Sequence, residues 1–551
     1  MDFEHIAMLA GGLGLFLYGM HLMGDGLEVA AGNRLRSLLN VLTRNRFLAI
    51  LVGFLFTAIV QSSSATTVMV VGFVNAGLMD LMQAAGVIMG ANIGTTVTGQ
   101  LIAFKLDQAA PLILLVGIIM MLFLKKKKAT EFGQIIAGFG ILFVGLSMMS
   151  ESMEPLRYDQ GVRDLFVSVG SNPFLCILVG LVVTMIIQSS SASIGILQAL
   201  AMQGDLIPLE GALFVLIGTN IGTCVTAVLS SVGTNKNARS AAVIHLLFNC
   251  FGAALMYALF SLPCVPWVSD GRFHMIYFKD MLNQIHPGDM SRQIAMANTI
   301  AKTLSVLVMV GFTKYLVRLS QWLVPGKAEK PAEDKLRYLD ERILLTPPVA
   351  VAQAQREVQR MGALALKNLE LSIEYFNQMD DNLIADMAQR EQCIDTLNHE
   401  ITKYLVLING LDITETDRRL IGSLFHVVTD IERIGDHAEN MYELGIERKN
   451  THAEFSENAQ RELSEMFTCS TEIVRESLIV FETGNREKLA EIEALEQRID
   501  DMQEKLHKEH IRRLNEAHCT PQSGAIFLEA VNNLERVGDH ACNISDSVTE
   551  R

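Results

Sequence analysis

A run of 33 uncharged residues, Phe47 to Met79, limits how this chain can fold. About 20 apolar residues cross a hydrocarbon core of about 30 Å, so one helix of about 50 Å is too long and each half of it is too short. The centre of the run is polar and reads Gln61-Ser62-Ser63-Ser64. We therefore expect a re-entrant hairpin of two half-helices with its polar tip buried in protein. A pair of ordinary spans with a polar centre is the alternative.

Other uncharged runs predict the membrane crossings. The stretch Pro173 to Gly204 repeats the polar-centred pattern with Gln188-Ser189-Ser190-Ser191 at its centre, which predicts a second hairpin. The full crossings are expected at 6–30, 81–104, 108–124, 132–150, 211–235, 240–269 and 293–313, the last interrupted only by Lys302. The sequence thus predicts seven spans and two hairpins that do not cross.

Basic clusters between the spans predict the orientation, because loops rich in Lys and Arg stay in the cytoplasm. The clusters are Arg34, Arg36, Arg44 and Arg46, then Lys125 to Lys128, then Lys236 and Arg239, and finally Lys314 and Arg318. All four lie inside when the N-terminus is outside and the C-terminus is cytoplasmic. The chain opens with Asp2 and Glu4, so we expect no cleaved signal peptide. We expect a multi-pass protein of the cell (inner) membrane.

The charge is divided unevenly along the chain. The net charge is −15, half of the residues are hydrophobic, and the whole acidic excess lies after residue 325. This division predicts a membrane domain at 1–324, a Pro-bounded linker at 325–348 and an acidic helical domain at 349–551. A secreted enzyme, a nucleic-acid binder and a disordered protein are excluded as descriptions of the whole chain. The eight cysteines have no paired spacing, which argues against a disulfide framework or a thiolate zinc site.

The membrane half contains an internal repeat. Three blocks recur in one order at offsets of 126 to 128 residues: Gly14–Gly19 as Gly140–Gly145, Gln61–Ala65 as Gln188–Ala192, and Gly90–Thr98 as Gly218–Thr226. The first copy spans about 6–124 and the second about 131–260, with 293–317 as an extra span. In the expected threading one copy starts outside and the other inside. Inverted copies of this kind build alternating access around a site at the membrane midplane.

The repeated side chains suit an anion and a small cation. Short helices that start at the tips aim backbone N–H groups at the centre, and serine hydroxyls add donors for an anion. Glutamine, asparagine and threonine oxygens, with carbonyls freed by the broken helices, are hard ligands for sodium. Helix–helix hydrogen bonding and small-residue packing are the alternative, which we favour for Gly86, Gly90 and Gly94.

The duplicated Gln-Ser-Ser-Ser, each copy followed by Gly-x-Asn-Ile-Gly-Thr, resembles the type II sodium–phosphate cotransporter family over about residues 6–320. The resemblance implies sodium-coupled uptake of inorganic phosphate. The segment Ala242–Asn249 looks like the family's His-x-x-Phe-Asn helix, whereas its expected echo departs from the pattern as Ala297–Lys302. The expected phosphate and Na⁺ sites comprise Gln61, Ser62, Ser63, Ser64, Thr66, Thr67, Asn92, Thr95, Gln188, Ser189, Ser190, Ser191, Asn220 and Thr223.

Two further positions in the membrane half stand out. Thr67 has Ile194 as its repeat counterpart, so a sodium site that uses Thr67 should be stronger than its symmetry mate. Back-bonding within its own helix is the alternative for this threonine. Lys302 is ionisable and deep within a span, which makes it a functional candidate. Snorkelling, or pairing with a carbonyl, is the alternative for the lysine.

The acidic half also repeats, because Glu432–Asn440 returns as Glu535–Asn543 and the pair Glu391 and Asp395 returns as Glu496 and Asp500. Two three-helix bundles account for the pattern, and they resemble the PhoU family over about 349–551. The resemblance implies metal binding, of divalent, iron or zinc ions, at Glu432, Asp436, Glu535 and Asp539. A solvated acidic face balanced by Arg433 and Arg536 is the alternative.

The predicted fold class is thus all-α: a polytopic membrane protein of two inverted repeats with re-entrant hairpins, followed by a soluble six-helix tandem bundle. We expect a phosphate transporter with a regulatory tail, and a phosphate sensor is the rival. An enzyme is not expected, because no Gly-x-Ser-x-Gly elbow, P-loop or His-Glu-x-x-His motif is present. Expected partners are phosphate, sodium, the lipid bilayer, a cytoplasmic regulatory protein and a second copy of the chain, with no nucleic acid.

Overall fold

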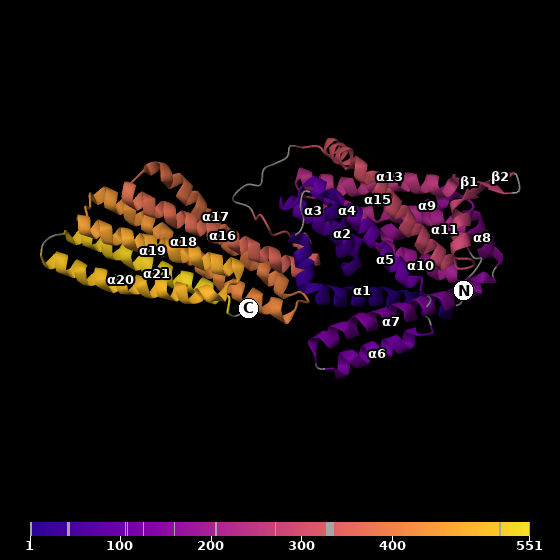
Figure 1. The fold of residues 1–551 in the computed structure, drawn as a ribbon, viewed down its shortest axis with the longest axis horizontal. Helices are drawn as coiled ribbons and strands as arrows, with labels where there is room; N and C mark the ends of the chain where they lie inside the picture. The colour runs from indigo at the N-terminus through magenta and orange to yellow at the C-terminus, as the bar shows by residue number, and fades with distance from the viewer. Residues whose placement is uncertain are drawn as a thin grey trace. The chain divides into compact units, whose positions relative to one another are not determined.

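The chain forms two compact units, Met1–Lys330 and Pro331–Arg551, in a computed structural model (Figure 1). The structure describes residues 3–40, 45–104, 106, 108–124, 126–158, 160–203, 207–269, 272–326, 336–516 and 519–549. Arg44 and Lys125, which support the predicted orientation, lie outside these residues. Helices dominate both units, which confirms the all-α class.

The helices of the first unit follow the repeat. The first copy comprises α1 (Phe3–Asn40), α2 (Arg46–Val60), α3 (Ser63–Asn75), α4 (Leu81–Gly94), α5 (Thr96–Ile102) and α6 (Ala110–Phe123). The second copy comprises α7 (Lys127–Met153), η1 (Glu154–Arg157), α8 (Gln160–Gly170), α9 (Pro173–Ile187), α10 (Ser190–Met202), α11 (Leu209–Gly222), α12 (Cys224–Ser230) and α13 (Lys236–Ser261). After them come α14 (Phe278–Ile285) and α15 (Met290–Leu323).

One small sheet interrupts the helices. Strands β1 (Pro263–Ser269) and β2 (Arg272–Tyr277) pair antiparallel between α13 and α14. The predicted span 240–269 is therefore too long, because α13 ends at Ser261. Pro263 and Pro266 have no backbone N–H to donate and disfavour helix in the residues before them, so an uncharged run can continue here without continuing the helix.

The polar-centred runs are each two helices. The helices α2 and α3 have 15 and 13 residues, and α9 and α10 have the same lengths, so each is about 20 Å long and too short to cross. Among the described residues, five helical segments are long and apolar enough to span a membrane: Phe3–Ala31, Lys128–Met153, Leu209–Ser230, Lys236–Ser261 and Met290–Leu323. The helix α6, expected as a full span, has only 14 residues.

Glycines hold each hairpin against the helix that follows it. A Cβ at Gly90 of α4 would overlap the carbonyl oxygen of Ile50 on α2, and one at Gly218 of α11 would overlap that of Ile177 on α9. Because these positions correspond in the two repeats, both hairpins rest on the same backbone contact. Gly86 and Gly94 also lie close to α2, so the packing interpretation of this glycine series is confirmed.

The helices α13 and α15 hold equivalent places. Every buried position of α13 from Ala238 to Ala253 falls, 53 residues later, on a buried position of α15 from Ser291 to Val306. The helix α13 packs on α11, α12, α3 and α4, whereas α15 packs on α4, α5, α10 and α11. When each helix is replaced by its counterpart in the other repeat, the neighbours of α13 become the neighbours of α15. The helix α15 therefore completes the first repeat in space, while α6 packs on α7.

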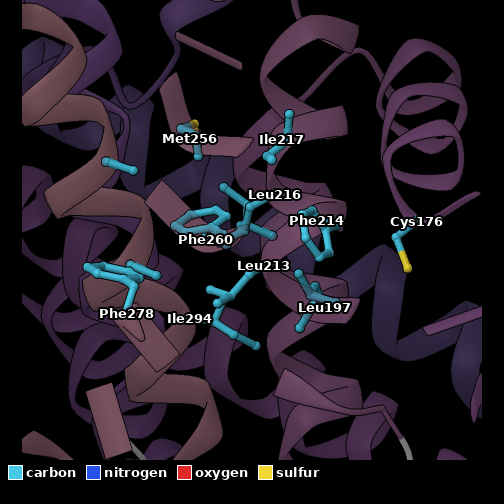
Figure 2. Close-up of a cluster of buried hydrophobic side chains, with 14 of the residues drawn as sticks. Cys176, Leu197, Leu213, Phe214, Leu216, Ile217, Met256, Phe260, Phe278 and Ile294 are labelled. Carbon is cyan, nitrogen blue, oxygen red and sulfur yellow. The ribbon is translucent and has the colours of Figure 1, made fainter. Parts of the chain in front are cut away.

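A hydrophobic cluster joins the second repeat to α14 and α15 (Figure 2). Leu197 of α10 and Leu213 of α11 lie in it with Ile294 of α15. The rings of Phe260 on α13 and Phe278 on α14 stack with centroids 5.5 Å apart. The second helix of the second hairpin is therefore anchored in a cluster to which α9, α11, α13, α14 and α15 also contribute side chains.

The second unit contains two three-helix bundles. The helices are α16 (Pro347–Gln378), α17 (Ile384–Asn409), α18 (Glu415–Thr451), α19 (Glu457–Thr483), α20 (Leu489–Asn515) and α21 (Pro521–Asp546), with short turns η2 (Glu341–Leu345), η3 (Asp381–Leu383) and η4 (Arg486–Lys488). Hydroxyl groups of Thr414, Ser456 and Thr520 cap the starts of α18, α19 and α21. The six helices match the predicted tandem bundle.

Part of the expected linker belongs to this second unit. The carboxylate of Glu357 on α16 is fully buried and accepts hydrogen bonds from the backbone N–H groups of Arg337, at 3.0 Å, and of Tyr338. The hydroxyl of Tyr404 donates to the carbonyl of Asp340 at 3.0 Å. A buried carboxylate needs donors, and the segment that precedes α16 supplies them. The rest of the linker, 327–335, lies outside the described residues.

The glycine contacts lead to a testable prediction. We expect Gly90→Ala and Gly218→Ala each to destabilise the membrane unit by about 2 kcal/mol or more, because overpacking against backbone cannot relax by a rotamer change. Gly14→Ala and Gly311→Ala are the controls, since no atom lies within 4 Å of a Cβ at either site. Thermal unfolding in detergent measures the effect. Equal stability in all four variants would contradict this packing.

Candidate functional site

The first polar tip is a sharp break between α2 and α3. Gln61 ends α2 in the left-handed region, with φ 58° and ψ 15°, and its N–H donates to the Thr57 carbonyl at 2.8 Å. Ser62 starts α3, and its hydroxyl accepts from the Ala65 N–H at 3.1 Å. The hydroxyls of Thr57 and Thr66 bond each other at 2.9 Å across the hairpin. These contacts fix both helix ends at the tip.

The second tip repeats the first almost atom for atom. Gln188 ends α9 with φ 57° and ψ 19°, and its N–H donates to Thr184 at 2.7 Å. The hydroxyl of Ser189 accepts from the Ala192 N–H at 3.2 Å, and Thr184 donates to the hydroxyl of Ser193 at 2.9 Å. A left-handed non-glycine residue costs of order 1–3 kcal/mol, so the contacts around both tips must hold the backbone in this conformation.

The two tips meet. The hydroxyl of Ser64, in the first turn of α3, donates to the carbonyl of Gln188 at 3.4 Å. The hydroxyl of Thr98 on α5 donates to Gln61 Oε1 at 2.7 Å. The structure thus brings the two predicted tips together, although 124 residues separate the bonded pair.

The meeting point offers both kinds of ligand. Helix geometry leaves the N–H groups of the first turn of α3 and α10 without intrahelical acceptors, and the helix dipole makes these ends positive. Ser63 and Ser64 lie in that turn of α3, and Ser190 and Ser191 in that of α10. The ends of α2 and α9 contribute carbonyl oxygens beside them. An anion and a small cation can therefore bind next to each other.

The exposure of the two tips differs. Gln61 is half-buried with Ser62, Ser63 and Ser64, whereas Gln188 is exposed and Ser190 and Ser191 are buried. A symmetric sequence therefore has an asymmetric environment. The two tips therefore differ in how far their side chains can be reached from outside the protein.

The remaining predicted side chains bond mostly to their own helices. Three threonine hydroxyls donate to the backbone carbonyl four residues earlier in the same helix: Thr67 to Ser63, Thr95 to Ala91 and Thr223 to Thr219. Asn92 likewise donates to the carbonyl of Ile88 at 3.0 Å. Each of these groups keeps oxygen lone pairs for a ligand. Asn220 donates to the sulfur of Met256, and its Oδ1 is buried without a partner.

Sequence reasoning missed several polar residues around the tips. Thr57 and Thr184 bridge the two arms of the hairpins, and they could have been found because they recur at the 127-residue offset. Gln198 of α10 is fully buried and donates to the carbonyls of Gly99 and Ser291, each at 3.1 Å. No repeat or motif indicates this bridge, because it depends on how α10, α5 and α15 meet.

Carboxylates gather on the second bundle of the tail. Oxygens of Glu496, Asp500 and Asp539 lie within 4.8 Å of one another, a separation that a metal ion could bridge. Burial, and then the charges of Asp500 and Asp539, raise the pKa of Glu496. Of the four predicted ligands, only Asp539 belongs to this group. The prediction missed Glu496 and Asp500 as its partners, although their repeat spacing was visible.

In the first bundle the acidic motif, Glu432 and Asp436, lies beside an arginine. Arg433 donates to Asp436 at 3.1 Å and lies 3.9 Å from Glu432, which fits the alternative of an arginine-balanced acidic face. Burial, then the charge of Asp436, raises the pKa of Glu432 despite this arginine. Glu535, the counterpart of Glu432, also has its pKa raised, by burial and then by Asp539.

Glu391 is the most perturbed carboxyl of the first bundle. It is 8% exposed, and the Nδ2 of Asn368 donates to it at 3.0 Å. Burial raises its pKa to about 7, with further contributions from the charges of Asp395, Glu439 and Asp436. This side chain therefore changes charge near neutral pH.

This shift leads to a pH prediction. Because the folded pKa lies above the unfolded one, the stabilising effect of Glu391 is full below about pH 4.5 and is lost as the pH rises through about 7. We expect residues 336–551 to become less stable between about pH 5 and pH 7.5, and Glu391→Gln to reduce that loss. Urea unfolding measures it, with Glu374→Gln, at an exposed site of α16, as the control. An equal pH dependence in all three proteins would refute the assignment.

Comparisons with known proteins agree with both units. The model described as Na+/Pi-cotransporter matches residues 15–151 and 147–263, and the PhoU domain model matches 358–445 and 463–548. Neither is an enzyme family. The apolar helices and the first match together make this a multi-pass membrane protein.

Individual relatives cover the chain in whole or in part. The putative inorganic phosphate export protein YjbB of Salmonella typhimurium is 24% identical over 98% of this chain and 97% of its own length. The uncharacterized protein YqeW of Bacillus subtilis is 32% identical over 57% of this chain and 96% of its own. A PhoU homolog of Xylella fastidiosa, named as a phosphate-specific transport system accessory protein, is 28% identical over 35% of this chain and 80% of its own. The chain belongs to the Na+/Pi-cotransporter family, and it carries PhoU domains after its membrane unit.

Proposed function

We propose that this protein is a sodium-coupled secondary transporter of inorganic phosphate. The observation that carries the proposal is the meeting of the two left-handed tips, where Ser64 of the first bonds the carbonyl of Gln188 in the second. Phosphate binds at the positive starts of α3 and α10, held by backbone N–H groups and by the serine hydroxyls. Sodium binds beside it, to glutamine, asparagine and threonine oxygens and to the carbonyl ends of α2 and α9.

Alternating access follows from the inverted repeats. Each tip is closed by a pair of bonded hydroxyls, Thr57 with Thr66 and Thr184 with Ser193, and its first helix rests on the helix after the hairpin through glycine contacts, so each hairpin moves as a rigid arm. Gln188 is exposed while Gln61 is half-buried, whereas Ser190 and Ser191 are more buried than Ser63 and Ser64. The two tips thus have different environments, and movement of one arm relative to the other would exchange them.

The direction of transport depends on the gradients. A carrier that moves sodium and phosphate together carries phosphate inward when the sodium gradient points inward, as the resemblance implies. Export is the second candidate, because a relative that covers 98% of this chain is named a putative phosphate export protein. Export while the sodium gradient points inward would require a carrier that exchanges phosphate for sodium or one that is not coupled to sodium. Measuring coupling therefore distinguishes the two candidates.

The tail serves as a regulatory domain. We place it in the cytoplasm of a cell whose inner membrane holds the first unit, with the N-terminus outside. The two acidic groups, around Asp436 and around Asp539, are the surfaces for metal ions or for a cytoplasmic partner. The tail would then report on phosphate or limit its flux. A phosphate sensor that binds without concentrative flux remains the rival.

A flux experiment tests the function. The full chain, reconstituted in proteoliposomes, should accumulate radiolabelled phosphate when sodium is outside and should not do so in choline. Ser63→Ala and Ser190→Ala should each reduce this uptake by about tenfold or more, since each removes a hydroxyl donor at one tip. Binding without accumulation would support the sensor. Accumulation independent of sodium would support an uncoupled carrier, and full activity in both variants would refute the tip site.

The left-handed glutamines permit a second test. Gln188→Gly relieves the strained backbone, whereas Gln188→Ala keeps it, and both remove the side chain. We expect both variants to lose transport equally, while only the glycine variant is more stable, by about 1 kcal/mol. Thermal unfolding and phosphate flux on the same samples measure the two effects. Normal flux in Gln188→Gly would remove this side chain from the site.

A further inference from the structure

Lys302 is a buried cation that the proposed transport mechanism does not use. Its side chain is 5% exposed, and it lies about 18 Å from the start of α15. In the part of the chain that the structure describes, no carboxylate lies within ion-pair distance of its ammonium. The groups that interact with it electrostatically are the thiol of Cys224 and the imidazole of His245. Burying an ammonium without a carboxylate partner costs free energy. A residue that bears this cost inside a membrane span is a candidate for a functional role.

The symmetry of the fold shows what stands in its place in the other repeat. The 53-residue shift that matches α13 to α15 places Asn298 on His245 and Lys302 on Asn249. Asn249 donates its Nδ2 to the carbonyl of His245 at 3.0 Å, and its amide oxygen can ligate a cation. Lys302 instead brings a cation of its own. One repeat thus has a cation ligand where the other has a fixed positive charge.

Unpaired polar atoms lie on the helix of this lysine and on α13 and α11, which pack against it. Asn298, one turn before it and 1% exposed, has neither amide atom hydrogen-bonded. His245, 2% exposed, has an unpartnered Nδ1, and Asn220, one turn before Cys224 and 3% exposed, has an unpartnered Oδ1. Buried polar groups normally have partners, so these amide oxygens indicate a place for a positive ligand. The break between α11 and α12, at Thr223, lies beside them.

We propose that the Lys302 ammonium takes the place of one coupled sodium ion, as a fixed charge on α15 beside the break between α11 and α12. The inference rests on the sodium-coupled transport proposed above. A neutral side chain at 302 leaves the oxygens of Asn298 and Asn220 to a small hard cation. The variant therefore binds one sodium more for each phosphate than the natural chain does.

The test compares three variants of the full chain in proteoliposomes. Lys302→Gln removes the charge with little change in size, Lys302→Arg keeps the charge, and Lys314→Gln removes an exposed lysine from the same helix. Radiolabelled sodium and phosphate fluxes give the coupling ratio. Titration of purified protein with inorganic phosphate, at low and high sodium, gives the affinity.

We expect the sodium-to-phosphate ratio of Lys302→Gln to rise by about one, with the ratios of the other two unchanged. Its phosphate affinity should fall about tenfold at low sodium and recover at high sodium, by mass action. An unchanged ratio and sodium dependence would overturn the inference. A folded variant whose phosphate affinity is not restored at any sodium concentration would also overturn it, because the lysine would then bind phosphate. A variant that folds in neither sodium nor choline would overturn it too, because the lysine would then support the fold.

The outcome also separates this inference from the proposed function. If the natural chain shows no sodium dependence, sodium coupling fails, yet the inference still requires Lys302→Gln to gain a sodium dependence that the natural chain lacks. Absence of that gain overturns the inference in either case. A gain of sodium dependence in Lys302→Gln supports the inference that the Lys302 ammonium replaces a sodium ion, whether or not the natural chain is coupled to sodium.

Discussion

Backbone groups that are freed where a membrane helix breaks must find partners inside the protein, and this requirement organises the membrane unit. At each tip the last N–H of the first arm returns to a threonine carbonyl, and a serine hydroxyl caps the second arm. The tips also meet, since the Ser64 hydroxyl bonds the Gln188 carbonyl. A break that would be unfavourable in lipid is thereby satisfied inside the protein, and its remaining polar groups are the ones assigned to ligands in the proposed function.

Close packing makes that arrangement possible. The half-helices are too short to cross the bilayer, so the first helix of each hairpin rests on a neighbouring helix through glycine–carbonyl contacts. The second hairpin is further held by the cluster around Leu197 and Leu213. Bonded hydroxyls, Thr57 with Thr66 and Thr184 with Ser193, then hold the two helices of each hairpin together. Strain at Gln61 and Gln188 persists because the surrounding contacts determine the backbone at both places. Rigidity of the arms and strain at the tips are thus two aspects of one design.

The sequence predicted the features that depend on local pattern. Both hairpins, the repeated blocks and the six tail helices are readable because residue identity repeats or because hydrophobic spacing changes. The equivalence of α13 and α15 was only partly visible, since His245 and Asn249 are replaced by Asn298 and Lys302 while burial alone persists. Burial depends on tertiary packing, which a motif comparison does not measure.

Other features could not be predicted for related reasons. The absence of charge over 240–269 did not show that α13 stops at Ser261 and a strand pair follows. The prolines at 263 and 266 were the available signal, but they affect the backbone and not the hydropathy. The segment before α16 looked like a linker because its partner, the buried Glu357, lies 20 residues further along the chain. At the acidic groups, the spacing indicated the correct helices. Which carboxylates converge depends on how α20 and α21 pack.

The two bundles of the tail show what such convergence does. In the first, Arg433 balances Asp436, whereas in the second Glu496, Asp500 and Asp539 come together within 4.8 Å. Burial raises the pKa values of Glu496 and Asp500, and the like charges of the neighbouring carboxylates raise them further. A proton or a cation that binds there stabilises the folded bundle in proportion to its occupancy. A domain whose stability depends in this way on a bound charge is suited to report the ionic conditions around it.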